Sequence, residues 1–91
     1  MTEKRGRKPK ARPEQIVGGT TEVDFTRSLG ARVADARSQR GWTPQDLAMR
    51  AGVSAVTVRA IELGSKCPKV YTVYRLALAL GVSAGYLGFG G

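Results

Sequence analysis

Apolar and polar residues alternate with a helical period from residue 25 onward. The first such stretch is residues 25–40, where apolar residues recur at spacings of four, four and three. These residues share one helical face: Phe25, Leu29, Val33 and Ala36. Asp24 or Thr26 can cap the start of this helix, and Gly41 can end it.

Two shorter amphipathic helices are predicted next, with a tight turn between them. Thr43 can cap the first of them, Pro44 suits its first position, and Asp46 completes a capping box. Gly52 can adopt the left-handed conformation that ends a helix, and Ser54 can cap the following one. The residues of the two apolar faces are Leu47, Ala48, Ala51, Val58 and Ile61. Two such helices joined by a short turn with glycine form a helix-turn-helix.

The last third of the sequence predicts two more helices. Residues 70–80 form an amphipathic stretch that Gly81 ends, and Ser83 can cap a final short turn over residues 84–87. The apolar face of the longer helix consists of Val73, Leu76, Ala77 and Leu80. The prediction is an all-α domain of five helices over residues 23–91, with roughly 65 ordered residues and no strand.

Residues 1–22 differ in composition and are predicted to form a disordered basic arm. Beyond Met1, the first twenty residues contain only Ile16 and Val17 as large apolar side chains, too few to offset the entropy of ordering. Residues 1–12 contain a single acidic residue beside six basic ones, namely Lys4, Arg5, Arg7, Lys8, Lys10 and Arg12.

The arm has three interpretations. The segment Arg5-Gly6-Arg7-Lys8-Pro9 resembles the AT-hook, a minor-groove element whose core is Arg-Gly-Arg-Pro, with Lys8 inserted before Pro9. The same charges can instead belong to a solvated tail that neutralises phosphates without reading sequence. A nuclear-localisation signal is the third alternative.

Charge and composition exclude several classes of function and favour others. Fifteen Lys and Arg against seven Asp and Glu give a formal charge of +8, which favours a polyanionic partner. One cysteine and no histidine exclude a zinc site, and no cofactor or small-molecule ligand is indicated. No apolar run is long enough for a membrane span or a signal peptide, so a cytoplasmic, nucleoid-associated protein is expected.

An enzyme is not expected. The carboxylates of residues 26–91 are Asp35, Asp46 and Glu62, and the sequence offers them no histidine or second cysteine as a partner. Asp46 has a capping role, and Asp35 lies on a polar helix face. There is also no phosphate-cradling glycine loop that follows a strand.

The order of these elements resembles the Cro/repressor family of helix-turn-helix domains, also called the xenobiotic-response-element family. The matching residues are Leu29, Val33, Arg37, Gly41-Trp42-Thr43, Leu47-Ala48, Gly52-Val53-Ser54, Ile61-Glu62, Gly64, Pro68, Leu80-Gly81-Val82-Ser83 and Tyr86-Leu87. The resemblance implies a compact, lambda-repressor-like five-helix domain that inserts its third helix into the major groove of duplex DNA. It also implies a structural ion pair between Arg37 and Glu62.

This resemblance assigns contacts to named positions. The expected base-contacting residues are Ala55, Val56, Thr57, Arg59 and Ala60, among which Arg59 alone can bind guanine in a bidentate manner. The expected phosphate contacts are Gln45, Ser54, Lys66, Lys69, Tyr71 and Thr72. Arg50 either reaches the DNA backbone or is solvated. Lys69 replaces the Ser or Thr that commonly caps the fourth helix in this family, and small apolar residues replace hydrogen-bonding ones on the third.

The predicted function is therefore a repressor-like, sequence-selective regulator of transcription that binds double-stranded DNA. The alternative is a protein-interaction module or antitoxin with the same fold, which the apolar surface of Ala55, Val56 and Ala60 would suit. The chain ends soon after the fifth helix. Any homodimer is therefore expected to be weak and built from that helix and Phe89, or to form only on DNA.

Overall fold

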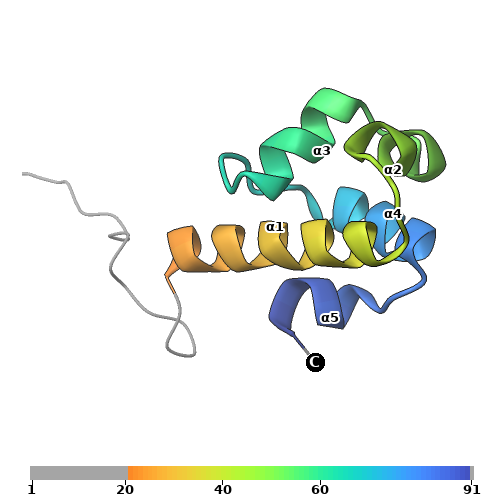
Figure 1. Cartoon of the computed structure of the whole chain (residues 1–91). Coiled ribbons are helices and arrows are strands. Elements are labelled where there is room, and N and C mark those ends of the chain that lie inside the picture. The colour runs from red at the N-terminus through yellow and green to blue at the C-terminus, as the bar shows by residue number, and fades with distance from the viewer. Residues whose placement is uncertain (1–20, 91) are drawn as a thin grey trace, which may run out of the picture.

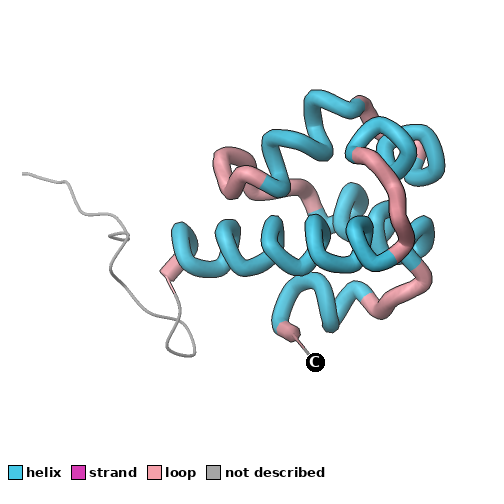
Figure 2. The backbone as a smooth tube through the Cα atoms, in the orientation of Figure 1, coloured by secondary structure: helices cyan, strands magenta, loops and turns pink. Residues whose placement is uncertain are grey.

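The computed structural model describes residues 21–90. Within this range the chain forms five helices and no strand (Figures 1 and 2). They are α1 (Glu22–Gln39), α2 (Pro44–Ala51), α3 (Ala55–Glu62), α4 (Val70–Leu80) and α5 (Ala84–Phe89). The predicted all-α, five-helix fold is confirmed. The basic residues assigned to the arm lie outside the described residues.

Helix α1 begins earlier than the apolar pattern indicated. Its N-cap is Thr21, whose side chain accepts a hydrogen bond from the backbone N–H of Asp24 at 3.1 Å. The expected caps, Asp24 and Thr26, both lie inside the helix, and Thr26 is buried. Glu22 and Asp24 occupy the first turn, where carboxylates are favoured by the helix dipole, and Val23 between them is exposed, so an extra turn precedes the buried apolar face.

The core lies between α1 and the four shorter helices. α3 packs on one side of α1 and α5 on the other, while α2 contacts both α3 and α4 (Figure 1). The largest fully buried side chains are Leu29, Leu47, Ile61, Leu76, Leu80, Leu87, Val33 and Val58. Every helix contributes at least one of them, so the five helices share a single core.

Gly30 allows α1 and α3 to approach closely. A Cβ atom at this position would collide with the backbone carbonyl oxygen of Ile61 and lie 3.1 Å from that of Glu62. These carbonyl groups belong to the last turn of α3 and cannot move as the end of a flexible side chain would. The absence of a side chain at residue 30 therefore sets the separation between α1 and α3.

Most of the helix ends follow the predicted signals. The capping box of Thr43 and Asp46 is present at the start of α2, and Gly52 ends that helix in the left-handed conformation with φ of 74°. Lys69 stands at the N-cap of α4 without a side-chain hydrogen bond. Helix α5 extends to Phe89, two residues beyond the predicted turn.

Two arginines hold the C-terminal ends of helices that lie far away in the sequence. Arg75 Nε donates to the carbonyl oxygen of Ala51 at 3.0 Å, at the end of α2. Arg32 Nη1 donates to the carbonyl oxygen of Leu87 at 3.0 Å, near the end of α5. Cationic groups at helix C-termini satisfy free carbonyls and oppose the negative end of the helix dipole. These two charges therefore stabilise the fold.

Candidate nucleic-acid interface

Helix α3 has one face fixed in the core and one face in solvent. Val58 and Ile61 are fully buried, while the Val56 side chain is 74% exposed and Arg59 is exposed. Ser54 caps the helix by accepting a hydrogen bond from the backbone N–H of Thr57 at 3.0 Å. The helix therefore presents a defined outer surface.

An ion pair fixes the far end of α3 to α1. Arg37 Nε lies 2.7 Å from Glu62 Oε2, and Arg37 Nη2 donates to Glu62 Oε1 at 3.0 Å, so the pair is bidentate. Arg37 Nη1 also donates to the carbonyl oxygen of Trp42 at 2.6 Å. The hydrogen bond with Glu62 raises the pKa of the Arg37 guanidinium above its ordinary value, while burial opposes the shift. Glu62 is thus turned inward, away from the solvent face of α3.

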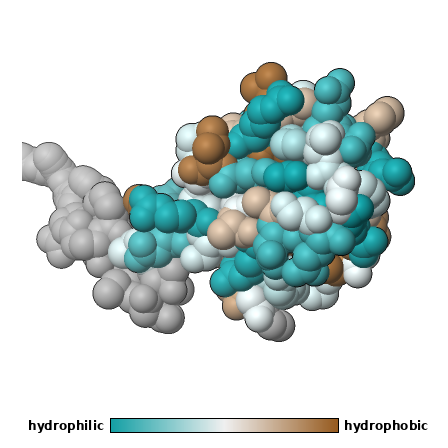
Figure 3. All heavy atoms as spheres, viewed as in Figure 1, coloured by the Kyte–Doolittle hydropathy of each residue, from teal (hydrophilic) through white to brown (hydrophobic). Residues whose placement is uncertain are grey.

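The five residues expected to contact bases differ in exposure. Val56 and Arg59 project into solvent, and Ala60 is half-buried. Ala55 packs partly against the core. The Thr57 hydroxyl oxygen accepts a hydrogen bond from Ser54 Oγ at 2.8 Å, which directs it toward the helix start. Figure 3 shows hydrophobic atoms at the surface over α3, beside hydrophilic ones.

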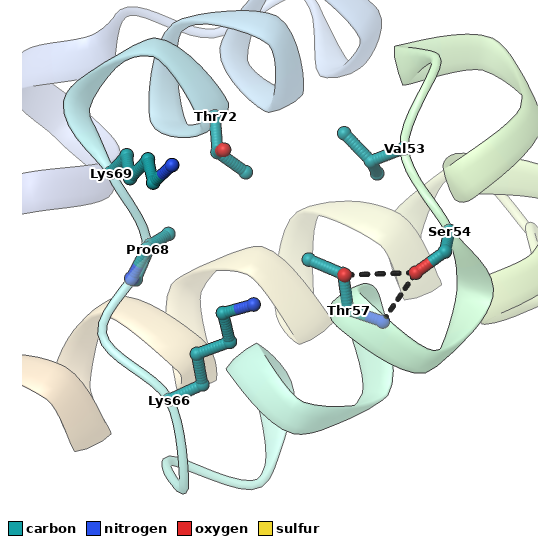
Figure 4. A pocket seen from close by; sticks show the side chains of 7 residues that line it. All are labelled: Val53, Ser54, Thr57, Lys66, Pro68, Lys69 and Thr72. Atoms are coloured by element: carbon teal, nitrogen blue, oxygen red, sulfur yellow. Dashed lines mark hydrogen bonds between the residues drawn. The ribbon is translucent and has the colours of Figure 1, made fainter.

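A pocket of about 270 Å³ lies between the N-terminal ends of α3 and α4. Its lining residues are Val53, Ser54, Thr57, Lys66, Pro68, Lys69 and Thr72. Figure 4 shows the ammonium groups of Lys66 and Lys69 extending toward the pocket from the α3–α4 loop. Four of the six predicted phosphate contacts are therefore brought together, although they come from separate segments.

The chemistry of this pocket suits an oxyanion. Two helix N-termini carry partial positive charge and free backbone N–H groups. At the start of α4 these backbone N–H groups remain free to bind a ligand, because the Lys69 side chain does not cap them. Two lysines, a serine and two threonines add further donors around the same space. A phosphate group is the ligand class that this combination favours.

The other predicted phosphate contacts lie elsewhere. Gln45 is exposed on the first turn of α2, and Tyr71 is exposed on α4, but neither lines the pocket. The Tyr71 ring stacks on the guanidinium of Arg75, whose Cζ lies 5.2 Å from the ring centroid. Arg50 stacks on Trp42 with its Cζ 4.4 Å from the ring centroid, so its charge is held over the indole.

The basic side chains of the described region therefore fall into two groups. One group is engaged within the fold by hydrogen bonds, an ion pair or aromatic stacking: Arg32, Arg37, Arg40, Arg50 and Arg75. For Arg27, Arg59, Lys66 and Lys69, residues 21–90 provide no such side-chain partner. Arg27 lies on α1, and the other three lie on α3 or the loop that follows it, which concentrates most of the available positive charge around α3.

Sequence reasoning missed Arg75 as part of the helix-turn-helix. The guanidinium of Arg75 occupies the space above Gly52, where a Cβ atom would lie 2.6 Å from its Nη2. Its position in α4 offered one signal, because it is the only charged residue of that helix. A lone arginine in an otherwise uncharged helix indicates a specific internal partner.

Across residues 21–90 no three His, Cys, Asp or Glu residues are grouped as metal ligands would be. The helices of this region are all too short or too polar to cross a bilayer.

Comparison with known proteins identifies the family. The helix-turn-helix family model HTH_3 matches residues 33–87. The HTH-type transcriptional regulator y4dJ of Sinorhizobium fredii is 36% identical over 61 residues, which covers 67% of this chain and 79% of the relative.

Solved structures agree with this match. The P22 c2 repressor in complex with a synthetic operator has a TM-score of 0.66 and 27% identity, and the match covers 69% of this chain and 96% of the repressor. SinR, the master regulator for biofilm formation, was solved with DNA and has a TM-score of 0.63 at 27% identity, covering 65% and 95%. The chain is a member of the helix-turn-helix family HTH_3.

Proposed function

We propose that this protein is a sequence-selective, DNA-binding regulator of transcription in which α3 reads bases and the pocket between α3 and α4 binds a backbone phosphate. The observation that carries the proposal is the position of Lys66 and Lys69 beside the exposed face of α3. A helix fits the major groove, and phosphate contacts beside it fix its register on the duplex. Family membership and the DNA complexes of the related repressors support the same function.

Base reading is assigned mainly to two residues of α3. Arg59 has the donor fork that binds guanine at O6 and N7, worth about 1–3 kcal/mol of discrimination. Val56 offers an exposed apolar side chain that can pack against the methyl group of thymine. Ala55 and Ala60 allow close approach, whereas Thr57 joins Ser54 at the phosphate pocket.

The basic arm is proposed to add affinity more than specificity. Its charges would neutralise phosphates on either side of the site bound by α3. Deletion of residues 1–20 should lower the salt dependence of binding and leave the base preference unchanged. A regulator of this kind acts in the nucleoid, and it needs no catalytic residues or cofactor.

A salt titration tests the proposed phosphate pocket. We expect the affinity of the full chain for a short duplex to fall with salt, and the slope to decrease by about 0.9 for each phosphate that is no longer neutralised. Lys66→Ala and Lys69→Ala should each lower the slope, while Arg50→Ala serves as a control because Arg50 is stacked on Trp42. Unchanged slopes in both lysine variants would exclude the pocket.

The same titration distinguishes DNA binding from the alternative function, a protein-interaction module or antitoxin. An antitoxin or adaptor that used the apolar part of α3 to hold a protein would bind its partner with little dependence on salt. Absence of duplex binding at low ionic strength would favour that alternative.

A further inference from the structure

The solvent face of α3 continues past the residues assigned so far and ends at Leu63. Val56 and Leu63 each lie two positions from a buried residue, Val58 and Ile61 respectively, which places both about 200° around the helix axis from the core. Their side chains are 74% and 81% exposed. Figure 3 shows hydrophobic atoms toward both ends of α3, beside hydrophilic ones. The outermost line of the helix therefore has an apolar residue at each end.

The fold holds the backbone of Leu63 on both sides. Leu63 is the C-cap of α3, with φ of −76° and ψ of −10°, and its N–H donates to the carbonyl oxygen of Arg59 at 3.0 Å. The residue before it, Glu62, is tied to α1 by an ion pair. The residue after it, Gly64, packs on α1, where a Cβ atom would lie 3.4 Å from the Cα of Arg27. A residue whose backbone is fixed in this way loses little further freedom when it binds.

We infer that Leu63 is a further specificity-determining residue, and that α3 recognises duplexes in which C5-methyl groups flank the guanine bound by Arg59. The inference rests on the proposed function. The C5-methyl group of thymine is the apolar group that a base pair presents in the major groove. An apolar side chain gains free energy by covering a methyl group and loses it where it leaves polar base atoms without partners. Leu63 cannot hydrogen-bond a base, so it selects for the methyl group.

The separation of the two apolar residues sets the spacing of the methyl groups. Val56 and Leu63 are seven positions apart, which is about 10 Å along the helix axis. Successive bases on one strand are about 3.4 Å apart, so a helix that lies along the groove spans about three base-pair steps between these residues. Arg59 lies between them in the sequence and is exposed. The predicted site therefore has a C5-methyl group at each end and a guanine between.

The group that Leu63 recognises is the methyl group rather than the base that carries it. 5-Methylcytosine presents the same C5-methyl group as thymine, with the amino donor of cytosine in place of the thymine O4 acceptor. A side chain that contacts only the methyl group accepts both bases. The ligand class therefore includes duplexes with methylated cytosine at this position.

Deoxyuridine, which is thymidine without the methyl group, tests the inference. The probe is the duplex that the full chain selects from random fragments, made with deoxyuridine in place of thymidine at one position at a time. Loss of a contacted methyl group should weaken wild-type binding about fourfold. At one position the same change should leave the affinity of Leu63→Ala unaltered. Leu78→Ala, the matched control, removes an exposed leucine of α4 and should respond as the wild type does.

Val56→Ala in the same series measures the spacing. The methyl group that no longer matters to Val56→Ala should lie about three base-pair steps from the one that no longer matters to Leu63→Ala. At the position contacted by Leu63, a duplex with 5-methylcytosine should bind the wild type about fourfold more tightly than one with cytosine, and Leu63→Ala equally. Thermal melts show that each variant is folded.

Three results would overturn the inference and leave the proposed function intact. They are wild-type binding that no deoxyuridine weakens, a methyl effect of equal size at every position in Leu63→Ala and the wild type, and adjacent positions for the two methyl groups. The first would assign the apolar ends of α3 to a protein partner. Equal binding of cytosine and 5-methylcytosine would overturn the extension to methylated cytosine. A wild type that selects no duplex would contradict the proposed function itself.

Discussion

Arg75 Nε donates a hydrogen bond to the carbonyl oxygen of Ala51 at 3.0 Å, which ties α4 to the last residue of α2. Gly52 follows, and its missing side chain leaves room for the guanidinium. The turn that orients α3 is therefore held by a residue 24 positions away in the sequence.

Removal of this hydrogen bond should destabilise the domain. Arg75→Ala leaves the Ala51 carbonyl without its charged donor, so we expect a decrease of about 1–3 kcal/mol in the free energy of unfolding. Arg59→Ala, which removes an exposed arginine, should change it by less than about 0.5 kcal/mol. Urea melts measure the free energy of unfolding of the two variants. Equal decreases in this free energy would show that Arg75 does not support the turn.

The ion pair between Arg37 and Glu62 should make a larger contribution than a surface pair. Their side chains are 17% and 11% exposed, which lies between a buried and an exposed pair. Glu62→Ala should lower the free energy of unfolding by about 2–3 kcal/mol, because Arg37 is left partly buried without its carboxylate. Asp35→Ala, which removes an exposed hydrogen bond to Gln39, is the control. A decrease under about 0.5 kcal/mol for Glu62→Ala would contradict the assignment.

Gly30 and Gly88 form a matched pair of buried glycines within helices. A Cβ at Gly30 would collide with the Ile61 carbonyl oxygen, whereas a Cβ at Gly88 would meet no atom within 4 Å. Gly30→Ala should therefore destabilise the domain by about 1–3 kcal/mol through forced separation of α1 and α3. Gly88→Ala should be neutral or stabilise it by up to about 1 kcal/mol. Chemical denaturation that ranks the two variants in the reverse order would contradict the close packing of α1 on α3.

The capping box at α2 should make stability depend on acid pH. The backbone N–H of Thr43 donates to Asp46 Oδ2 at 2.9 Å, and this bond is the main cause that lowers the pKa of Asp46, with further lowering by the Thr43 side chain and by the charge of Arg50. Because the pKa is lower in the folded state, the stabilisation is complete above the unfolded value of about 3.9 and is lost as the pH falls through the folded value.

Denaturation midpoints of the wild type and Asp46→Asn across the acid range test this effect. Asparagine keeps an acceptor oxygen but does not titrate, so the difference between the two proteins should shrink as the pH falls below about 4. A difference that stays constant, or that grows in acid, would mean that the carboxylate has no role in the cap.

Local patterns in the sequence were sufficient for most of the fold. The capping box at Thr43, the left-handed Gly52 and the buried faces of α2 and α3 all depend on residues within a few positions of one another. The start of α1 was missed because the helix is extended by a turn whose one apolar residue, Val23, is exposed and does not belong to the buried face. α5 was predicted too short because its last residues are glycine and phenylalanine rather than a periodic apolar set.

The candidate site was harder to predict from the sequence than the fold, because the residues that form it are far apart in the chain. Residue type pointed to Lys66 and Lys69, but only the packing of α3 and α4 brings these lysines to one pocket with Ser54. Thr57 was expected to face bases. Instead its hydroxyl oxygen accepts a hydrogen bond from Ser54, and the sequence spacing of the two residues does not predict which partner the side chain takes. The roles of Arg32 and Arg75 also depend on tertiary contacts.

Selection of bound fragments from random duplexes, with the wild type and Arg59→Ala side by side, tests most directly whether α3 reads the bases. The wild type should yield a consensus that includes a guanine, and Arg59→Ala should lose the preference at that position while it keeps the others. An identical consensus from the two proteins, or no enrichment by the wild type at low ionic strength, would contradict base reading by α3.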